Sequence, residues 1–238
     1  MNLVLNVDTA VVDLGLIEYQ KAWDYQTEVF NSILETKKQN RSIPPHEHQP
    51  TRNYLLFCEH PAVFTLGKSG VKTNLLASAE ELAEHNAAYV HTNRGGDITF
   101  HGPGQLVVYP VIDLENFFTD IHTYMRGLEE AVILTLEMYG VRGERIPNLT
   151  GVWISDGGGP PRKICAMGVK TSRWVTMHGL ALNVSVDLKY FSLIIPCGIT
   201  DKAVTSLEKE TGHTVAMPDV KEILKASIAD VFAMNLIS

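Results

Sequence analysis

The sequence contains few cysteines, which excludes a small fold held together by disulfide bonds. There are three, Cys58, Cys165 and Cys197, an odd number scattered along 238 residues. Disulfide-rich secreted domains carry many more cysteines at regular spacings. We therefore expect a reducing, cytoplasmic setting in which a single cysteine remains a thiol.

The chain also lacks an excess of positive charge and a long apolar run. Its 20 Lys and Arg residues against 27 Asp and Glu residues give a formal net charge of −7, whereas nucleic-acid binders present basic surfaces. No stretch approaches the roughly 18 consecutive apolar residues of a membrane span. Residues 1–8 lack the basic and apolar regions of a signal peptide. We expect neither nucleic acid nor a membrane as a partner.

Repeats and low-complexity tracts are absent as well, and the apolar pattern predicts four helices. Apolar residues recur at helical spacing over 16–34, 119–139 and 220–231. Ser78 and Glu81 have the spacing of a capping box, which marks the start of a further helix. We interpret the apolar faces of these helices as core-facing.

The runs between the helices predict strands and a fold of the α+β class. The expected strands are 3–7, 54–58, 63–66, 106–111, 152–155, 163–169, 173–177 and 179–186. Four of them follow Gly151 with short connections, whereas a parallel crossover needs about a dozen residues or more. We expect a mixed, largely antiparallel sheet covered by helices. The polar stretch 37–52 is read as a surface loop, which leaves a single domain over residues 1–238.

The densest group of glycines lies between Arg94 and Gln105. Four glycines and a proline in twelve residues fix a tight path and let backbone N–H groups approach a ligand closely. Neither nucleotide-binding fingerprint, G-x-x-x-x-G-K-[ST] or G-x-G-x-x-G, is present in this stretch. Arg94, Thr99 and His101 place hydrogen-bond donors beside the turn. A structural hairpin would also fit, but the residues favour a binding loop.

Two further places hold candidate nucleophiles. Cys197 stands between Pro196 and Gly198, which could present its thiol in a cleft, although such a cysteine is more often a buried apolar residue. If 163–169 is a strand, Lys163 and Cys165 share one face. A lysine at that position is usually solvated, but a partly buried ammonium would favour a neighbouring thiolate and could transfer protons. Cys165 is then a rival nucleophile.

Charge and histidine placement add two weaker expectations. Residues 157–186 and 61–79 contain no Asp or Glu but carry lysines and arginines. Either chance or a positive patch for an acidic protein or a phosphate group accounts for this. The remaining histidines lack the spacing of a zinc site, so we expect no metal.

Six stretches of the chain resemble motifs of the octanoyl-[acyl-carrier protein]:protein N-octanoyltransferases of lipoate biosynthesis. They occur in that family's order within residues 54–207. The stretches are EHPAVFTLG (59–67), RGGDITFHGPGQ (94–105), PNLTGVW (147–153), RKICAMGV (162–169), HGLALN (178–183) and PCG (196–198).

The resemblance implies an acyl transfer in two halves, with no cofactor and no metal. Octanoyl-acyl-carrier protein donates the acyl group to Cys197, and Lys163 lowers the pKa of that thiol and serves as acid and base. The acceptor is a lysine of an apo lipoyl domain of a 2-oxoacid dehydrogenase or of the glycine-cleavage H protein. The residues implied to line the substrate are Arg94, Gly95, Gly96, Asp97, Ile98, Thr99, Phe100, His101, Ala166, Met167, Gly168, Gly179, Leu180 and Ala181. The implied fold is that of the biotin and lipoate protein ligases.

The chain departs from the family pattern at two positions. Trp174 stands where the family commonly has glycine, which predicts an altered mouth of the acyl site. Cys165 stands where the family has small residues, which favours a packing role. Three rival functions stay open: an ATP-dependent lipoate or octanoate ligase of the same fold, a non-catalytic module that binds lipoyl domains, and a thiol protease. The thiol protease lacks a signature in the sequence.

Overall fold

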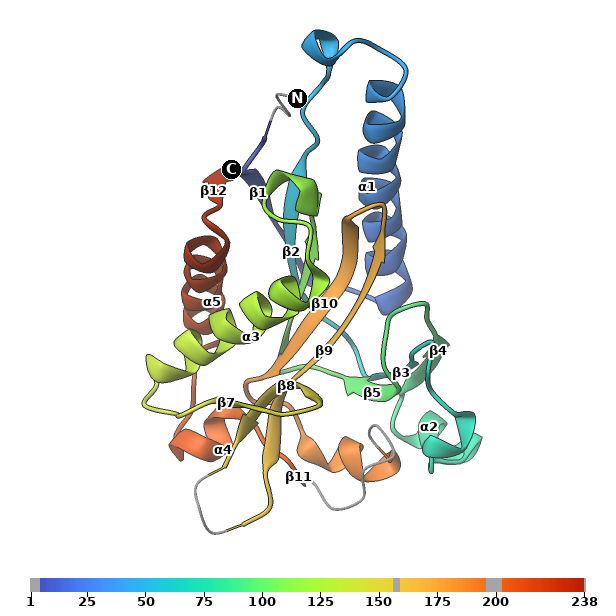
Figure 1. The fold of residues 1–238 in the computed structure, drawn as a ribbon. Helices are drawn as coiled ribbons and strands as arrows, with labels where there is room; N and C mark the ends of the chain where they lie inside the picture. Colours follow the sequence, from blue (N-terminus) through green and yellow to red (C-terminus); the bar gives the residue numbers. More distant parts are fainter. Residues whose placement is uncertain (1–4, 156–158, 196–202, 238) are drawn as a thin grey trace.

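The computed structural model describes residues 5–155, 159–195 and 203–237, and these residues form a nine-stranded main sheet with helices on both faces (Figure 1). Its strands are β1 (Asp8–Leu16), β2 (Asn53–Glu59), β6 (Gln105–Val111), β7 (Glu144–Ile146), β8 (Leu149–Ile154), β9 (Arg162–Ser172), β10 (Val175–Asn183), β11 (Ala203–Val204) and β12 (Asn235–Ile237). The order is β12-β1-β2-β6-β10-β9-β8-β7, and β11 pairs with β9. Strand β1 runs parallel to β12 and β2, and β11 runs parallel to β9, whereas the other neighbours are antiparallel. The predicted α+β class with a mixed, largely antiparallel sheet is confirmed.

A small second sheet lies beside the main one. It consists of β4 (Ala88–His91), β3 (Val63–Leu66) and β5 (Ile98–His101), in the order β4-β3-β5. Strand β3 is fully buried, and β5 comes from the glycine-rich stretch that the sequence pattern assigned to a turn. The glycines therefore flank a short strand and do not form one continuous loop.

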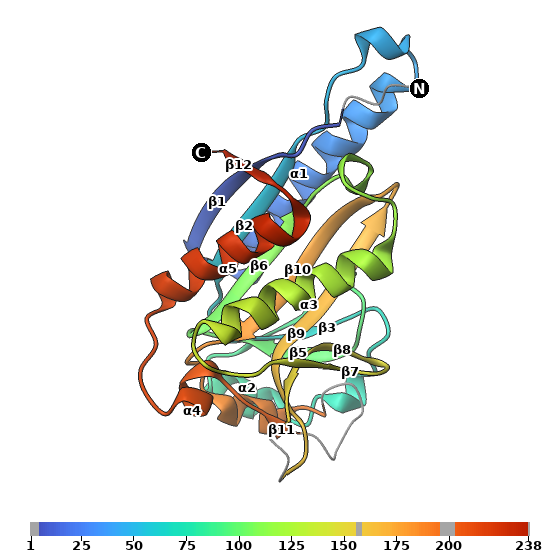
Figure 2. The same cartoon turned by 60° about the vertical axis from the view of Figure 1, so that its left-hand side comes forward.

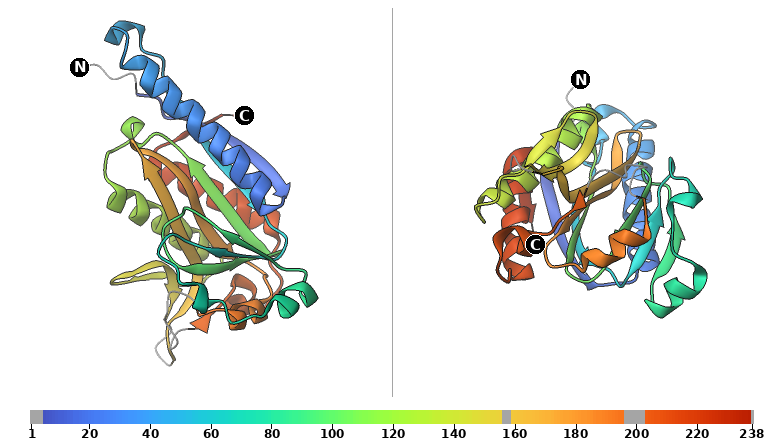
Figure 3. Two further views of the ribbon diagram at one scale, coloured as in Figure 1. Left: turned by 90° about the vertical axis from the view of Figure 1, so that its right-hand side faces the viewer. Right: turned by 90° about the horizontal axis from the view of Figure 1, so that it is seen from below.

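Helices cover the two faces of the main sheet unequally. They are α1 (Tyr19–Asn40), α2 (Ala79–Glu84), α3 (Ile121–Glu137), α4 (Leu207–Thr211) and α5 (Met217–Phe232), with short 3-10 turns η1 (Pro45–Glu47), η2 (Lys72–Asn74), η3 (Leu114–Asn116) and η4 (Leu188–Leu193). Helices α3 and α5 lie side by side on one face (Figure 2). Helix α1 packs on the other face (Figure 3). Each face buries its own apolar cluster, as the helical periodicity predicts. No helix within the described ranges has both the length and the apolar character to cross a bilayer.

Three sequence-based boundaries are wrong for identifiable reasons. The first strand is Asp8–Leu16, since pairing with β2 and β12 selects a more polar segment than the apolar run 3–7. The strands expected at 173–177 and 179–186 form the single strand β10. The loop expected from Lys37 begins only after Asn40, because the Lys37 ammonium is buried in ion pairs with Asp113 (2.5 Å) and Glu115 (2.8 Å). The predicted capping box of Ser78 and Glu81 is confirmed.

Candidate active site

A cavity of about 510 Å³ is bordered by both sheets, a volume typical of small-molecule sites. All residues that the resemblance placed at the substrate line this cavity except Phe100, and Lys163 lines it too. Arg94 to Thr99 and His101 come from β5 and the loop before it, whereas Ala166 to Gly168 and Gly179 to Ala181 come from the paired strands β9 and β10. The glycine-rich loop with β5 and the β9–β10 hairpin, which are far apart in the sequence, thus line one cavity.

Phe100 lies outside this wall. Its ring is buried in a separate apolar cluster with Phe64 and stacks on Tyr190, with 4.4 Å between ring centroids. Side chains alternate along a strand, so Phe100 points away from the face on which Thr99 and His101 lie. The expectation that Phe100 lines the substrate is corrected on this ground.

The loop before β5 lies close against the neighbouring segments, which explains the glycines that face it. The Gly95 N–H donates to the carbonyl of Val169 (3.0 Å). A Cβ added at Gly168 would lie 2.7 Å from the carbonyl oxygen of Gly95, and one at Gly67 would lie 2.3 Å from that of Gly96. Contacts this short cannot be accommodated without displacing backbone, so these positions require glycine.

Arg94 anchors this loop to β3. The side chain is buried, and its Nη2 donates to the carbonyl oxygen (2.5 Å) and to the Oγ1 (2.9 Å) of Thr65. Nη1 donates to the carbonyl of Gly95 (3.0 Å). Several donors of the guanidinium are therefore directed at the protein itself, which fixes a positive charge beside the cavity.

His101 is held neutral in the cavity wall. Its Nδ1 lies 2.7 Å from Gln105 Oε1 and its Nε2 lies 3.3 Å from Thr65 Oγ1. Since an amide oxygen only accepts, Nδ1 carries the proton and Nε2 accepts from the threonine hydroxyl. Burial, followed by the charges of His60 and Arg94, holds the pKa of His101 well below its usual value.

His178 lies in the middle of β10 with a left-handed backbone, φ 61°. Its N–H donates to Gln26 Oε1 on α1 (2.9 Å), and its Nε2 donates to Asn93 Oδ1 (2.8 Å). Burial, with the charges of Arg94 and Lys170, lowers the pKa of His178 to about 3. His178 lines the cavity, although the sequence analysis placed only the three residues after it at the substrate.

A buried aromatic group forms another part of the wall and was missed by sequence reasoning. Tyr19 and Tyr109 line the cavity, and the Tyr109 hydroxyl donates to His60 Nε2 (2.7 Å). His60 Nδ1 donates in turn to the carbonyl of Ile17 (2.7 Å), and burial lowers the pKa of this histidine. His60 lies within a family-like motif, but Tyr19 is one of several apolar residues at helical spacing and Tyr109 lies in an apolar strand, so no local signal distinguishes the tyrosines.

Lys163 reaches the cavity from the start of β9. Its Nζ lies 4.6 Å from the centroid of the Trp153 ring, a cation–π contact. An added Cβ at Gly151, which has φ 112°, would lie 3.6 Å from Lys163 Cε. Strand β8 therefore packs against the aliphatic part of the lysine side chain at Gly151 and against its ammonium at Trp153.

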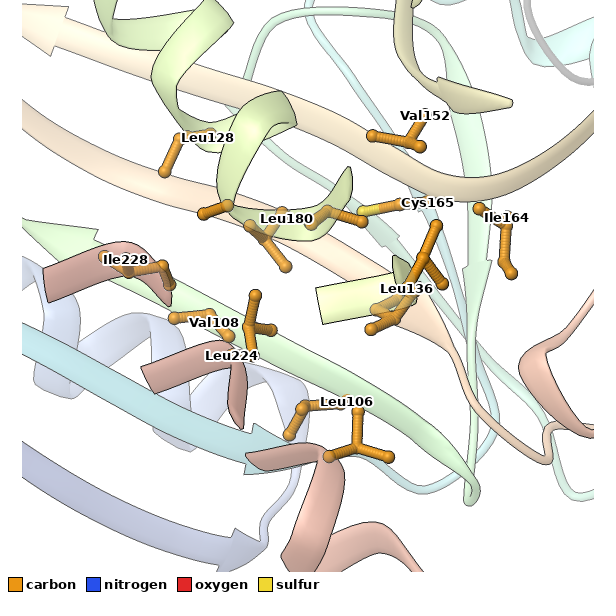
Figure 4. Packing of buried hydrophobic residues seen from close by; sticks show 14 of the residues in the cluster. Leu106, Val108, Leu128, Leu136, Val152, Ile164, Cys165, Leu180, Leu224 and Ile228 are labelled. Carbon is orange, nitrogen blue, oxygen red and sulfur yellow. The ribbon is translucent and has the colours of Figure 1, made fainter. Parts of the chain in front are cut away.

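Cys165 is in the core and not in the cavity wall. It is fully buried among apolar residues that include Val152 and Leu180 (Figure 4), and burial raises the pKa of its thiol. The β8–β9 pairing shifts register between Val152 and Trp153, so Lys163 lines the cavity while Cys165 packs beneath it. These surroundings favour packing over nucleophilic attack for Cys165.

Cys197 lies outside the described residues, but the chain on both sides of it borders the cavity. Phe191 in η4 and Val204 in β11 line the cavity. Strand β11 pairs with β9 so that Val204 lies opposite Lys163. Ile195 donates its N–H to the carbonyl of Asn74 (2.8 Å).

Trp174 does not line the cavity, contrary to the expectation that it alters the mouth of an acyl site. Arg173 and Trp174 form the two-residue turn between β9 and β10, with φ of 51° and 66°, and neither lines the cavity. Such a turn requires positive φ at both positions, which explains a preference for glycine there.

The basic stretches have different surroundings. Arg162 is paired with Glu210 (2.9 Å), and the Lys170 ammonium lies 5.2 Å from the centroid of the Phe30 ring. Lys68 and Lys72 are exposed, and the Lys68 N–H donates to the carbonyl of Arg94 at the cavity loop (2.9 Å). Across the part of the chain that the structure describes, His, Cys, Asp and Glu side chains form no group of three suited to a metal ion.

Comparison with solved structures defines the class of fold. The chain matches one chain in a structure described as a bi-partite lipoate protein ligase and its E2 lipoyl domain from Thermoplasma acidophilum, with a TM-score of 0.62 and 17% identity, over 97% of this chain and 87% of that chain. It matches lipoate-protein ligase A bound with ATP with a TM-score of 0.61 and 15% identity, over 98% and 90% of the two chains. The fold is therefore that of the lipoate protein ligases.

Sequence comparison is more specific. The model of the lipoyl protein ligase A/B catalytic domain matches residues 18–229. An octanoyltransferase of Cytophaga hutchinsonii is 57% identical over 97% of this chain and 95% of its own length. An octanoyltransferase of Christiangramia forsetii is 54% identical over 98% and 99% of the two chains. The chain belongs to the lipoyl protein ligase A/B catalytic domain family and, within it, to the octanoyltransferases.

Proposed function

We propose that this protein transfers an octanoyl group from octanoyl-acyl-carrier protein to Cys197 and then to the lysine ε-amine of an apo lipoyl domain, including that of the glycine-cleavage H protein. The proposal treats residues 1–238 as one catalytic domain acting in the cytoplasm. The observation that carries it is the cavity in which Lys163 lies opposite Val204, a few residues after Cys197 in sequence.

In the first half of the reaction, the Cys197 thiolate attacks the thioester carbonyl of the donor. The new thioester forms as the bond to the phosphopantetheine sulfur breaks, and the proton from Cys197 passes through Lys163 to that leaving sulfur. A free cysteine is only a few per cent ionised near pH 7, so a nearby ammonium raises the reactive fraction. One thioester replaces another, so this half needs no ATP.

In the second half, the neutral acceptor amine attacks the acyl-enzyme carbonyl. The amide bond forms as the bond to the Cys197 sulfur breaks, and the proton lost by the amine returns through Lys163 to the sulfur. An amide is more stable than a thioester, which drives the overall transfer. N–H groups of the glycine-rich loop are suited to stabilise the oxyanion of each tetrahedral intermediate.

The surroundings support Lys163 as the proton carrier. His101 and His178 are held neutral by burial, and an arginine such as Arg94 does not release its proton in a protein. Lys163 lies in the cavity wall, and its ε-amine can both release and accept a proton.

The exposed lysines near the cavity loop are suited to the donor. Lys68 and Lys72 lie in a stretch without acidic residues, although the net charge of the whole chain is −7. An acidic carrier protein would be attracted to this local positive region in a salt-dependent way.

A comparison of two acyl donors distinguishes this function from that of an ATP-dependent ligase of the same fold. The purified protein is mixed with an apo lipoyl domain and either octanoyl-acyl-carrier protein without ATP, or free octanoate with ATP. We expect modification with the first donor, and none when the acceptor lysine is replaced by arginine. Modification with octanoate and ATP alone would establish a ligase, and binding without modification by either donor would establish a non-catalytic module.

A further inference from the structure

A chain of buried polar side chains runs from the glycine-rich loop to the residue after β11. It starts at Thr65, whose Oγ1 accepts from Arg94, and continues through His101, Gln105 and Asn183. Thr65, His101, Gln105 and Asn183 are each at most 6% exposed, so water does not replace these contacts.

Only one assignment of donors and acceptors satisfies every hydrogen bond in this series of side chains. Gln105 Nε2 donates to the carbonyl of Phe100 (3.1 Å) and to Asn183 Oδ1 (2.9 Å), which leaves Gln105 Oε1 to accept from His101. Asn183 Oδ1 is an acceptor, so its Nδ2 is the donor to the carbonyl of Thr205 (2.9 Å). Each amide is thus fixed in one orientation by both of its neighbours.

This series of hydrogen-bonded side chains ends beside Lys163. The Thr205 N–H donates to the carbonyl of Lys163 (3.0 Å), and the Thr205 Oγ1 donates to Glu210 (2.5 Å). The peptide groups of Thr205 are therefore held by Asn183 on one side and by the backbone of the lysine on the other. Strand β11, directly before Thr205, is only two residues long, so its own ladder bonds supply little of this restraint.

We infer that Gln105 and Asn183 are positioning residues for the acyl transfer, because they hold Thr205 and β11 in register with Lys163. This inference rests on the proposed function, in which the nucleophile Cys197 precedes β11 by a few residues. Neither side chain is charged, and neither needs to touch the reacting atoms. Their contribution is to keep the chain that follows the nucleophile at a fixed place beside the lysine.

Asn183→Asp tests this inference with a change of one group. The carboxylate keeps its size and accepts from Gln105, but it cannot donate to the Thr205 carbonyl. Asn116→Asp is the matched control, because Asn116 is also a buried asparagine that donates to two oxygens, of Thr51 and Asn53, but does not line the cavity. Asn183→Ser, which is small and uncharged, serves if the aspartate variant does not fold.

The measurement is the rate of acyl-enzyme formation at Cys197, followed by rapid quenching and intact mass at a series of octanoyl-acyl-carrier protein concentrations. Misplacement by about 1 Å can cost a factor of about 100, so we expect the maximal rate to fall by about 100-fold. The half-saturating donor concentration should stay near the wild-type value, and Asn116→Asp should acylate at the wild-type rate. Unfolding midpoints of all variants are measured in parallel.

The outcomes separate this inference from the proposed function. If the wild type forms no adduct on Cys197, the proposed function fails and the inference fails with it. If the wild type forms the adduct and folded Asn183 variants form it equally fast, only the inference is overturned. It is also overturned if Asn116→Asp slows acylation as much as Asn183→Asp does, because the effect would then follow from lost stability alone.

Discussion

His178 illustrates how single residues of this site combine strain and burial. A residue other than glycine rarely has a positive φ inside a strand. At His178 the backbone N–H donates to Gln26 Oε1 instead of to the neighbouring strand. The next residue, Gly179, has no space for a side chain, since an added Cβ would lie 2.1 Å from the carbonyl oxygen of Val108. The backbone path of β10 against β6 and α1 therefore requires glycine at position 179 and a positive φ at position 178.

The lowered pKa of His178 predicts a loss of stability in mild acid. Between about 3 and the unfolded value of 6.5, the unfolded chain binds a proton that the folded chain does not, so stability falls as pH falls through this window. At pH 5.5 this one group lowers the free energy of unfolding by about 1.4 kcal/mol relative to pH 8. His178→Asn removes the titrating group, and asparagine tolerates positive φ.

Urea unfolding at pH 8 and pH 5.5 measures this effect. The free energy of unfolding of His178→Asn should fall by about 1.4 kcal/mol less than that of the wild type between these two pH values. An equal fall in both proteins would show that His178 has the same pKa in the folded and unfolded chains.

Sequence reasoning found those site residues whose type is dictated by the backbone or by the chemistry. Gly95, Gly96 and Lys163 are of this kind, and all three line the cavity. Phe100 was misplaced because the motif does not reveal which residues of a short strand face inward. Tyr19 was missed because only the tertiary packing at the start of α1 brings it to the cavity, where its ring stacks on that of His101.

At the level of elements, Glu129 connects α3 to the first half of strand β8. It is fully buried, and its Oε1 accepts from the Gly151 N–H (3.0 Å) while its Oε2 accepts from Arg126 (2.6 Å) and Arg145 (3.2 Å). Residues 148–150, just before this contact, line the cavity. One carboxylate thus fixes a wall of the site from α3, whose Met125 also lines the cavity.

Replacing Glu129 by alanine should loosen this wall. Glu129→Ala leaves the buried Gly151 N–H without its acceptor, which costs about 1–3 kcal/mol of unfolding free energy. Glu130→Ala is the control, since Glu130 is part-exposed and pairs with Arg145 in the same cluster. This substitution should lower the free energy of unfolding by no more than about 1 kcal/mol. Denaturant unfolding and octanoyl-transfer rates are measured for both, and equal losses would contradict the assigned role of Glu129.

Elements with strong local signals were predicted well. The buried run 63–66 is β3, and the apolar period after Asp120 is α3, whose start Asp120 caps. The fused strand β10 and the polar strand β1 could not be predicted, because each depends on partners distant in sequence. The short strand β5 was hidden by the glycines around it.

At the scale of the whole molecule, the cavity exists because two sheets meet. The small sheet supplies the glycine-rich loop, and the main sheet supplies Lys163 and the β9–β10 wall. These segments are separated by long stretches of chain, so no local pattern could place them together. The order of family-like motifs carried that information, whereas periodicity alone predicted only the α+β class.

The most direct test of the account is intact mass after mixing the full chain with octanoyl-acyl-carrier protein in the absence of an acceptor. Wild type and Cys165→Ser should each gain the mass of one octanoyl group, Cys197→Ser should gain none, and Lys163→Ala should acylate far more slowly. An adduct that persists in Cys197→Ser and disappears in Cys165→Ser would contradict the account.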